Sequence, residues 1–432
     1  MTKIEIPLSF KARPIWPEDV SAPSISYAVE PYQAQAGRSV QKVLAGRRLA
    51  SPMIDLNDYL CRAEIDWLAL RVVTPGFHQA RNLQPAIAGV LGDIGSRSTV
   101  FVTGPNGETG YKGSDFILKF QQPNSRELGH VLAQFAGRYG LDTARLPELR
   151  IMGVEISVDF YVKGVECLPG DLADLKRWQM VDILRRHLKP EPVLTELPAA
   201  GPRFYGGKFG GSGATHFVSP SAKDLGHRVL ASAPRLGLEP EHLVALDLNK
   251  HSQPDVDATS WIGAKGCHVM LRTMDKVTDQ RDPSRGTVVN LPMAERRARV
   301  EVTLQGKADE VGGHGAVGLK SLGDLAGFSF KTIRRTFFEF YLATFGNQCD
   351  GTVLDIKLRA NEEEIFRRSG VYGLDRFHRA VQLVNHARIA KGEKGVSVVR
   401  LGDKGRMLSW MDMNQKIDRA LKKLGKDWDR LF

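Results

Sequence analysis

The sequence predicts an α+β protein with a largely antiparallel sheet, and three features of its hydrophobic pattern carry that prediction. Runs of alternating apolar and polar residues, typical of strands, recur between Glu64 and Leu304. Single amphipathic segments with the period of a helix interrupt these runs. From about Leu319 onwards the pattern becomes mainly helical. Strands broken by single helices are typical of α+β domains, and the later helices indicate a second, mostly helical domain.

The chain divides by composition into three parts. Residues 1–55 carry six prolines and little periodicity, so we expect an extended N-terminal arm with one short helix near Arg38–Leu49. Residues 56–310 hold the sheet domain, and residues 311–432 form a basic helical C-terminal domain. The full length of 432 residues is sufficient for two or three domains.

Within residues 56–310, strands and helices follow one another. The pattern predicts strands at Glu64–Val73, Thr99–Thr103, Phe116–Phe120 and Arg150–Val162, and helices at Pro123–Tyr139 and Leu172–Leu188. A Gly-rich stretch at Gly206–Gly213 follows. Its spacing does not fit a phosphate-binding loop, so a plain connection is the favoured interpretation. Two further strand-like runs then flank a polar loop between residues 260 and 304.

The C-terminal part combines helical periodicity with positive charge. The expected helices are Phe328–Phe345, Asn361–Ser369, Leu374–Ala390 and Trp410–Leu424. Residues 311–432 hold 22 Lys and Arg against 14 Asp and Glu, which is +8 of the chain's net charge of +11. A basic amphipathic helix is more often a solvated face than a recognition helix. The concentration of charge nevertheless favours a polyanionic partner, and nucleic acid above all.

Cysteine usage and the N-terminal sequence indicate the compartment. Cys61, Cys167, Cys267 and Cys349 are scattered without any Cys-x-x-Cys pair, which argues against a zinc ribbon or a redox motif. The first residues lack the apolar core of a signal peptide, and no run reaches the ~18 apolar residues of a membrane span. We therefore expect a soluble cytoplasmic protein with reduced thiols and no membrane partner.

Three of the predicted strands each collect polar side chains on one face. Because successive side chains of a strand point to opposite faces, Arg272, Met274 and Lys276 stand together. The same rule groups Arg297, Arg299, Glu301 and Thr303 in a second strand, and Glu155, Ser157, Asp159 and Tyr161 in a third. If the opposite face covers a core, these residues form an exposed charged surface of the kind that binds phosphates and metals.

Three short motifs in this region resemble those of rolling-circle replication initiators. They are Trp261-Ile262-Gly263-Ala264-Lys265, then Leu271-Arg272-Thr273-Met274-Asp275-Lys276, then Arg299-Val300-Glu301-Val302. In order and spacing they are similar to plasmid and filamentous-phage replication initiation factors and to the related conjugative relaxases. The sequence departs from the family at one position, because the tyrosine expected between Arg272 and Lys276 is Met274.

The resemblance implies a saddle-like sheet domain that binds an origin hairpin or single DNA strand and nicks one strand through a tyrosine. The basic helical domain would dock duplex DNA, and a homodimer is compatible with this scheme. Because of Met274, a cleavage-deficient DNA-binding protein on the same fold is the alternative. A metal-dependent hydrolase that uses the same carboxylates is a third interpretation.

The family's chemistry requires a divalent metal and a nucleophile. The expected ligands for Mg²⁺ or Mn²⁺ are Asp66, Glu155, Asp159 and Glu301, since these hard ions prefer carboxylates. A face exposed to solvent without any ion is the plainer interpretation. Tyr161 and Tyr205 are the candidate nucleophiles in place of Met274, although a structural tyrosine is the default for each.

Basic residues on the same strands are the expected phosphate contacts. Arg272 and Lys276 are the candidates closest to the chemistry, because guanidinium and ammonium groups bind phosphate. The full set of expected DNA contacts is Lys265, Arg272, Lys276, Arg297, Arg299, Arg334 and Arg335. Cross-strand pairing with Glu301 or Asp275 is the competing explanation for Arg272, Lys276 and Arg299.

Overall fold

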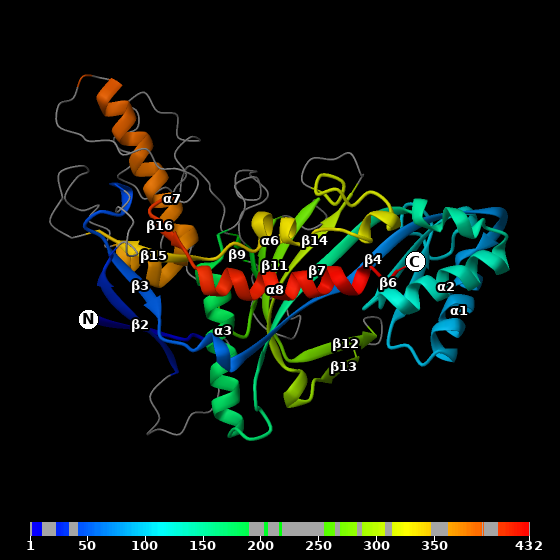
Figure 1. Cartoon of the computed structure of the whole chain (residues 1–432), viewed down its shortest axis with the longest axis horizontal. Coiled ribbons are helices and arrows are strands. Elements are labelled where there is room, and N and C mark those ends of the chain that lie inside the picture. The colour runs from blue at the N-terminus through cyan, green and yellow to red at the C-terminus, as the bar shows by residue number, and fades with distance from the viewer. Residues whose placement is uncertain are drawn as a thin grey trace.

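A computed structural model of the chain describes residues 2–10, 23–33, 42–189, 203–205, 216–217, 255–263, 268–282, 287–306, 313–346, 362–390, 392 and 405–431. Its centre is a nine-stranded antiparallel sheet (Figure 1). In spatial order the strands are β5 (Thr99–Thr103), β6 (Lys112–Gln121), β4 (Tyr59–Gln79), β7 (Arg150–Val162), β14 (Arg297–Gln305), β11 (Val269–Lys276), β10 (Thr259–Ile262), β8 (Arg203–Tyr205) and β9 (His216–Phe217). The predicted α+β class is confirmed.

The long central strands follow directly from the alternating pattern. Strand β7 has the predicted bounds, and β4 extends the predicted strand Glu64–Val73 to 21 residues. The β4–β7 pairing shifts register between Ile65 and Trp67, which leaves Asp66 as an extra residue in the ladder. A bulge of this kind re-aims the side chain of the inserted residue.

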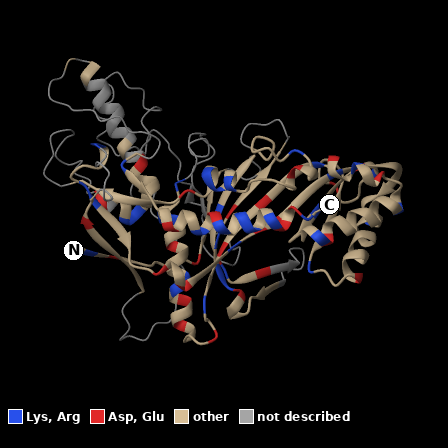
Figure 2. Cartoon of the chain, in the orientation of Figure 1, with Lys and Arg blue, Asp and Glu red and all other residues tan. Residues whose placement is uncertain are grey.

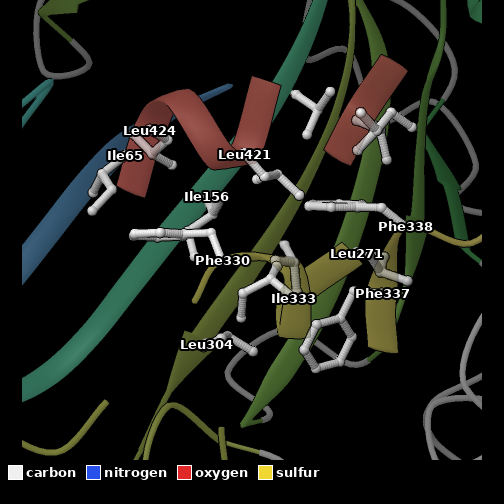
Figure 3. Packing of buried hydrophobic residues seen from close by; sticks show 14 of the residues in the cluster. Ile65, Ile156, Leu271, Leu304, Phe330, Ile333, Phe337, Phe338, Leu421 and Leu424 are labelled. Carbon is white, nitrogen blue, oxygen red and sulfur yellow. The ribbon is translucent and has the colours of Figure 1, made fainter. Parts of the chain in front are cut away.

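Helices cover the apolar face of this sheet. Helix α8 (Met411–Trp428) and helix α6 (Lys331–Phe337) contact each other, and α8 also contacts β4 and β7. Figure 3 shows Leu421 and Leu424 of α8 among Ile65 and Ile156 of the strands. Helix α3 (Gly170–His187) packs against β7, β11 and β14. Burial of this apolar surface, at about 25 cal/mol per Å², is the main favourable term that holds the layers together.

Two further helices lie at the β5 end of the sheet. Helix α2 (Ser125–Tyr139) was predicted and begins with Asn124, whose side chain accepts from the backbone N–H groups of Arg126 and Glu127. Helix α1 (Ala80–Asp93), which contacts β5, was not predicted. Its sequence contains Pro85 inside the helix, which weakens the helical signal because proline lacks the backbone N–H that a helix interior uses.

A second, five-stranded sheet joins the two ends of the chain. Its order is β1 (Thr2–Pro7), β2 (Ser24–Pro31), β3 (Arg48–Pro52), β15 (Tyr341–Phe345) and β16 (Met407–Ser409). The described parts of residues 1–55, for which an extended arm was expected, are mainly strands of this sheet. Of the short helix expected near Arg38–Leu49, residues 38–41 lie outside the described residues; Lys42–Leu44 is a 3-10 turn, and Leu49 lies in β3.

The C-terminal part is helical but also supplies strands. The helix expected at Phe328–Phe345 ends at Phe337, because Tyr341–Phe345 pairs with β3 and β16 as β15. Helix α7 (Glu362–Ala390) covers both helices expected there, separated by a kink at Gly370 with φ 66°. The polar loop after β11 contains a hairpin of β12 (Thr278–Asp282) and β13 (Thr287–Asn290) that was not predicted.

No helix in the described part of the chain combines the length and the apolar character needed to span a membrane.

Candidate functional site

The candidate site lies on the sheet face opposite the helices, where cross-strand register aligns the predicted polar residues. Arg272 is opposite Glu301, and Glu301 is opposite Ser157 of β7. The next row contains Met274, Arg299, Asp159 and Arg62, and the row beyond contains Lys276, Arg297, Tyr161 and Leu60. The strand parity read from the sequence is confirmed, since polar residues from four adjacent strands share one face.

Three of the four predicted metal ligands converge. Asp66, Glu155 and Glu301 offer carboxylate oxygens that all lie within 4.8 Å of one another. Each comes from a different strand, and the bulge after Ile65 brings Asp66 into the group. Glu155 is 4% exposed and Glu301 is 0% exposed. We call these residues the carboxylate triad.

Asp159, the fourth predicted ligand, lies outside the carboxylate triad. Its two oxygens accept hydrogen bonds from Nε and Nη2 of Arg299, at 2.6 and 2.7 Å. Nε of Arg297 also lies 3.0 Å from Asp159 Oδ2. A buried carboxylate held by two guanidinium groups has little capacity left for a metal ion, so Asp159 is better explained as the partner of these arginines.

Arginine side chains also reach the carboxylate triad. Arg299 Nη1 donates to Asp66 Oδ1 at 2.8 Å and lies 3.7 Å from Glu301 Oε2. Arg272 forms an ion pair with Glu301, and its Nη2 lies 3.5 Å from Glu155 Oε1. The cross-strand pairing that competed with phosphate binding is therefore present for Arg272 and Arg299. Lys276 pairs instead with Asp279, at 3.3 Å.

Glu301 is the least satisfied member of the carboxylate triad. It forms ion pairs with Arg272 and Arg299, but neither of its buried oxygens accepts a hydrogen bond from the described residues. The guanidinium groups of Arg272 and Arg299 compensate its charge instead. Oxygen ligands in this state match the preference of Mg²⁺ and Mn²⁺, so the residues present fit a hard divalent ion.

The electrostatic environment separates the protonation behaviour of two carboxylates. Burial raises the pKa of Glu155 against the opposing charge of Arg272. Burial also acts to raise the pKa of Asp66, but the Arg299 guanidinium outweighs it, and the pKa of Asp66 is lowered. Burial lowers the pKa of Lys276. The carboxylate triad therefore holds one readily ionised group beside one that binds a proton more strongly than an ordinary glutamate.

We call the sheet face formed by these rows of β4, β7, β14 and β11, together with the carboxylate triad, the charged face. Its side chains are less exposed to solvent than expected. Most of its carboxylates and arginines are buried, and Arg299 is only 1% exposed. Arg62 is exposed, and other side chains keep partial contact with solvent, among them Arg272 at 27%, Lys276 at 22% and Asp66 at 18% exposure. The sequence pattern identified the face correctly, while the expectation of a fully exposed surface was wrong.

The two candidate nucleophiles occupy different rows. The Tyr161 hydroxyl donates to Asp159 Oδ2 at 3.5 Å, and the guanidinium groups of Arg62 and Arg297 lie 5.2 and 5.5 Å from its ring centroid. Burial raises the pKa of Tyr161, which makes its phenol harder to ionise. Tyr205 is in register with Thr259 of β10, which is itself opposite Met274.

Several contributors to the site were missed in the sequence. The Lys119 ammonium lies 3.7 Å from the ring centroid of Trp67, and Trp67 is opposite Glu155. Burial lowers the pKa of Lys119, while the charge of Glu155 opposes that shift. Thr303, which strand parity had placed on this face, donates its hydroxyl to Glu155. Alternation within Phe116–Phe120 could have placed Lys119 on the polar face, because it follows a residue of the apolar face.

The remaining predicted DNA contacts differ in their exposure to solvent and in their internal ion pairs. Arg297 and Arg334 are buried, and Arg334 pairs with Glu339 at 3.2 Å and with Asp418 at 2.9 Å. Arg335 is exposed. Lys265 and the Gly-rich stretch lie outside the described residues. Internal pairing therefore explains Arg334 better than a DNA contact does.

A search with protein-family models finds no match to this chain, and a comparison with curated protein sequences finds none either.

Proposed function

We propose that the chain is a replication initiator or relaxase of the rolling-circle type, which binds a DNA strand across the charged face and nicks it with the help of a divalent ion. The observation that carries the proposal is the carboxylate triad, in which two buried glutamates and Asp66 come together within 4.8 Å. Three carboxylates this close together favour a bound cation, although Arg272 and Arg299 already pair with Glu301. The DNA of a plasmid or phage lies in the cytoplasm, where we propose that the chain acts.

Asp66, Glu155 and Glu301 would hold Mg²⁺ or Mn²⁺. When bound, the ion would polarise the scissile phosphate and stabilise the charge that develops on its oxygens. Arg272 and Lys276 would bind the same phosphate group from the rim, where both side chains keep some exposure. Arg272 would exchange part of its pairing with Glu301 for the phosphate, since both partners are anionic oxygens.

The bond changes are those of a transesterification. A tyrosine oxygen would bond to phosphorus as the bond between phosphorus and the 3′-oxygen breaks. The tyrosine would lose its proton, and the released 3′-oxygen would take one up to become a 3′-hydroxyl. Of the two candidates, the register favours Tyr205, which shares a row with Met274, the position that resembles the family's tyrosine. The raised pKa of Tyr161 argues against its activation.

A DNA-binding protein that does not cleave is the second candidate function. Two observations favour it: Met274 carries no nucleophile, and the arginines already neutralise much of the carboxylate charge. In this case the charged face would serve strand binding, with Arg272 and Lys276 as the accessible cations.

The deciding experiment uses a random-sequence pool of single-stranded DNA labelled at its 3′ end, incubated with the full chain and Mn²⁺. Attack by a tyrosine leaves the labelled fragment attached to the protein, where a denaturing gel detects it. Loss of the adduct in Tyr205→Phe or Tyr161→Phe would identify the nucleophile. Binding without cleavage would support the second candidate. Cleavage without an adduct would indicate a metal-dependent hydrolase, and absence of any DNA binding would overturn both proposals.

A further inference from the structure

Helix α8 has a basic stripe on the side that faces away from the sheet. Its apolar side chains, including Ile417, Leu421 and Leu424, are buried. Four exposed basic residues lie along the other side, where Arg419 is three and four residues before Lys422 and Lys423, and Lys426 is four and three residues after them. Positions three and four apart are neighbours on a helix surface. We call these four residues the α8 stripe, and Figure 2 shows the blue segments along the helix.

Cations outnumber carboxylates around the α8 stripe. Residues 413–429 hold five Lys and Arg against three Asp, namely Asp418, Asp427 and Asp429. The Asp418 carboxylate pairs with Arg334 of α6, with Nε 2.9 Å from Oδ1. Helix α6 contacts α8 and carries the exposed residues Lys331 and Arg335. This side of α8 therefore has a net positive charge, which attracts a polyanion.

The α8 stripe is separate from the carboxylate triad. Ile156 lies beside Leu421 in the core under α8 (Figure 3), whereas its neighbour Glu155 belongs to the carboxylate triad. Adjacent residues of a strand point to opposite faces, so the two features lie on opposite sides of the sheet. The α8 stripe must therefore bind a segment of its partner different from the one that reaches the charged face.

We infer that the α8 stripe binds the backbone phosphates of duplex DNA, an inference that rests on the proposed function. From Arg419 to Lys426 the helix rises about 10 Å, and duplex DNA carries one charge per about 1.7 Å, so four cations can each meet a phosphate. Contacts between side chains and phosphates do not distinguish one base from another, so we expect this binding to be independent of the DNA sequence.

The composition of the helix favours DNA over a lipid surface. An interfacial helix inserts apolar side chains between lipids. On α8 the apolar side chains are buried against the protein, with Met411 at the N-terminal end as the exposed exception. The α8 stripe can therefore recognise a partner only through its positive charge, and the phosphate backbone of DNA has the complementary negative charge.

The test measures how binding of a fluorescent random-sequence duplex depends on salt, between about 50 and about 200 mM, for the full chain and two variants. Lys422→Gln with Lys426→Gln removes two charges from the α8 stripe. Lys112→Gln with Lys320→Gln removes two exposed lysines elsewhere and is the matched control. We expect the slope of log K against log salt to fall by about 1.8 in the stripe variant, because each phosphate contact contributes about 0.9.

The predicted loss of affinity in the stripe variant is between about 10-fold and about 60-fold at 0.1 M salt. The control variant should keep the slope of the unmodified chain. Equal losses in both variants, an unchanged slope in the stripe variant, or no binding of duplex at all would overturn the inference. Mn²⁺ binding and adduct formation with single-stranded DNA report on the carboxylate triad independently. If the stripe variant shows the smaller salt slope while the unmodified chain neither binds Mn²⁺ nor forms an adduct, the inference about the α8 stripe would stand and the proposed function would be refuted.

Discussion

Arg299 binds both carboxylate oxygens of Asp159 across the β7–β14 pair, and its third nitrogen binds Asp66 on β4. One arginine thus links three adjacent strands at the centre of the sheet while it is almost completely buried. Burial acts to lower the pKa of Arg299, but Asp159 and Asp66 outweigh it and raise that pKa well above its ordinary value. The charged face is in this respect part of the fold's interior as well as a candidate site.

Arg299→Met should destabilise the protein by about 3–5 kcal/mol, because it leaves Asp159 and Asp66 as buried carboxylates without their main partner. Urea unfolding followed by circular dichroism measures the change. Arg145→Gln is the control, since Arg145 and Glu148 form an exposed pair at 71% and 63% exposure and should contribute little. A loss no larger than that of the control would mean that the Arg299 network does not stabilise the sheet.

Buried His187 should make the fold sensitive to mild acid. Burial lowers the pKa of His187 to about 4, and its ring contacts the Tyr27 hydroxyl and the Tyr341 carbonyl. The unfolded chain binds a proton at a higher pH than the folded chain does, so stability falls as the pH drops from about 6.5 towards about 4.

Between about pH 7 and about pH 5 we expect His187 to remove about 2 kcal/mol of stability. Unfolding midpoints at the two pH values measure this. In His187→Gln the pH-dependent difference should shrink by that amount, whereas His130→Gln, at an exposed position, should leave it unchanged. An identical pH dependence in all three proteins would show that His187 does not titrate in this way.

Met274→Tyr should introduce a hydroxyl at the position where the similar motif of the replication initiators has its tyrosine. Met274 lies on the charged face between Arg272 and Lys276 and opposite Arg299. If the site can polarise a phosphate, the new tyrosine should form or increase a covalent adduct with single-stranded DNA. Met274→Phe supplies the ring without the hydroxyl and should not. Equal behaviour of the two variants would refute position 274 as the site of attack.

Leu421→Ala should cost about 2–5 kcal/mol, since Leu421 is fully buried between α8 and the sheet. The neighbouring Lys422→Ala changes an exposed position and should stay within about 0.5 kcal/mol of the unmodified chain. Chemical unfolding compares the two variants. A small effect of Leu421→Ala would mean that α8 is only loosely attached to the sheet, which would also weaken the proposal that α8 binds DNA.

Local patterns predicted the long elements of this fold and missed the short ones. Strand β7 alternates strictly from Val154 to Val162, and its bounds were predicted correctly. Strand β15 consists of five consecutive buried residues, for which helix and strand give the same pattern. The strands of residues 1–55 are short, and β3 pairs with β15 almost three hundred residues away, a relationship that no local window contains.

Local patterns also predicted part of the candidate site and missed the part that depends on long-range pairing. Strand parity predicted which residues share the charged face, because the two-residue period is local. Parity does not determine which of those residues pair with each other. Asp159 therefore ranked equally with Glu155 as a ligand, although Arg299 engages it in the folded chain. The bulge that brings Asp66 to the carboxylate triad depends on the pairing of β4 with β7 and has no signal in the sequence.

Binding of a divalent ion by the carboxylate triad can be measured by titration of the full chain with Mn²⁺, followed through the loss of the free ion's electron paramagnetic resonance signal. We expect stoichiometric binding near neutral pH that weakens with acidification, because burial raises the pKa of Glu155 and a proton competes with the metal there. Glu301→Gln should weaken binding by more than about tenfold, whereas Glu148→Gln, at an exposed carboxylate, should not. Absence of Mn²⁺ binding by the unmodified chain, or equal binding by both variants, would show that the carboxylate triad is not a metal site.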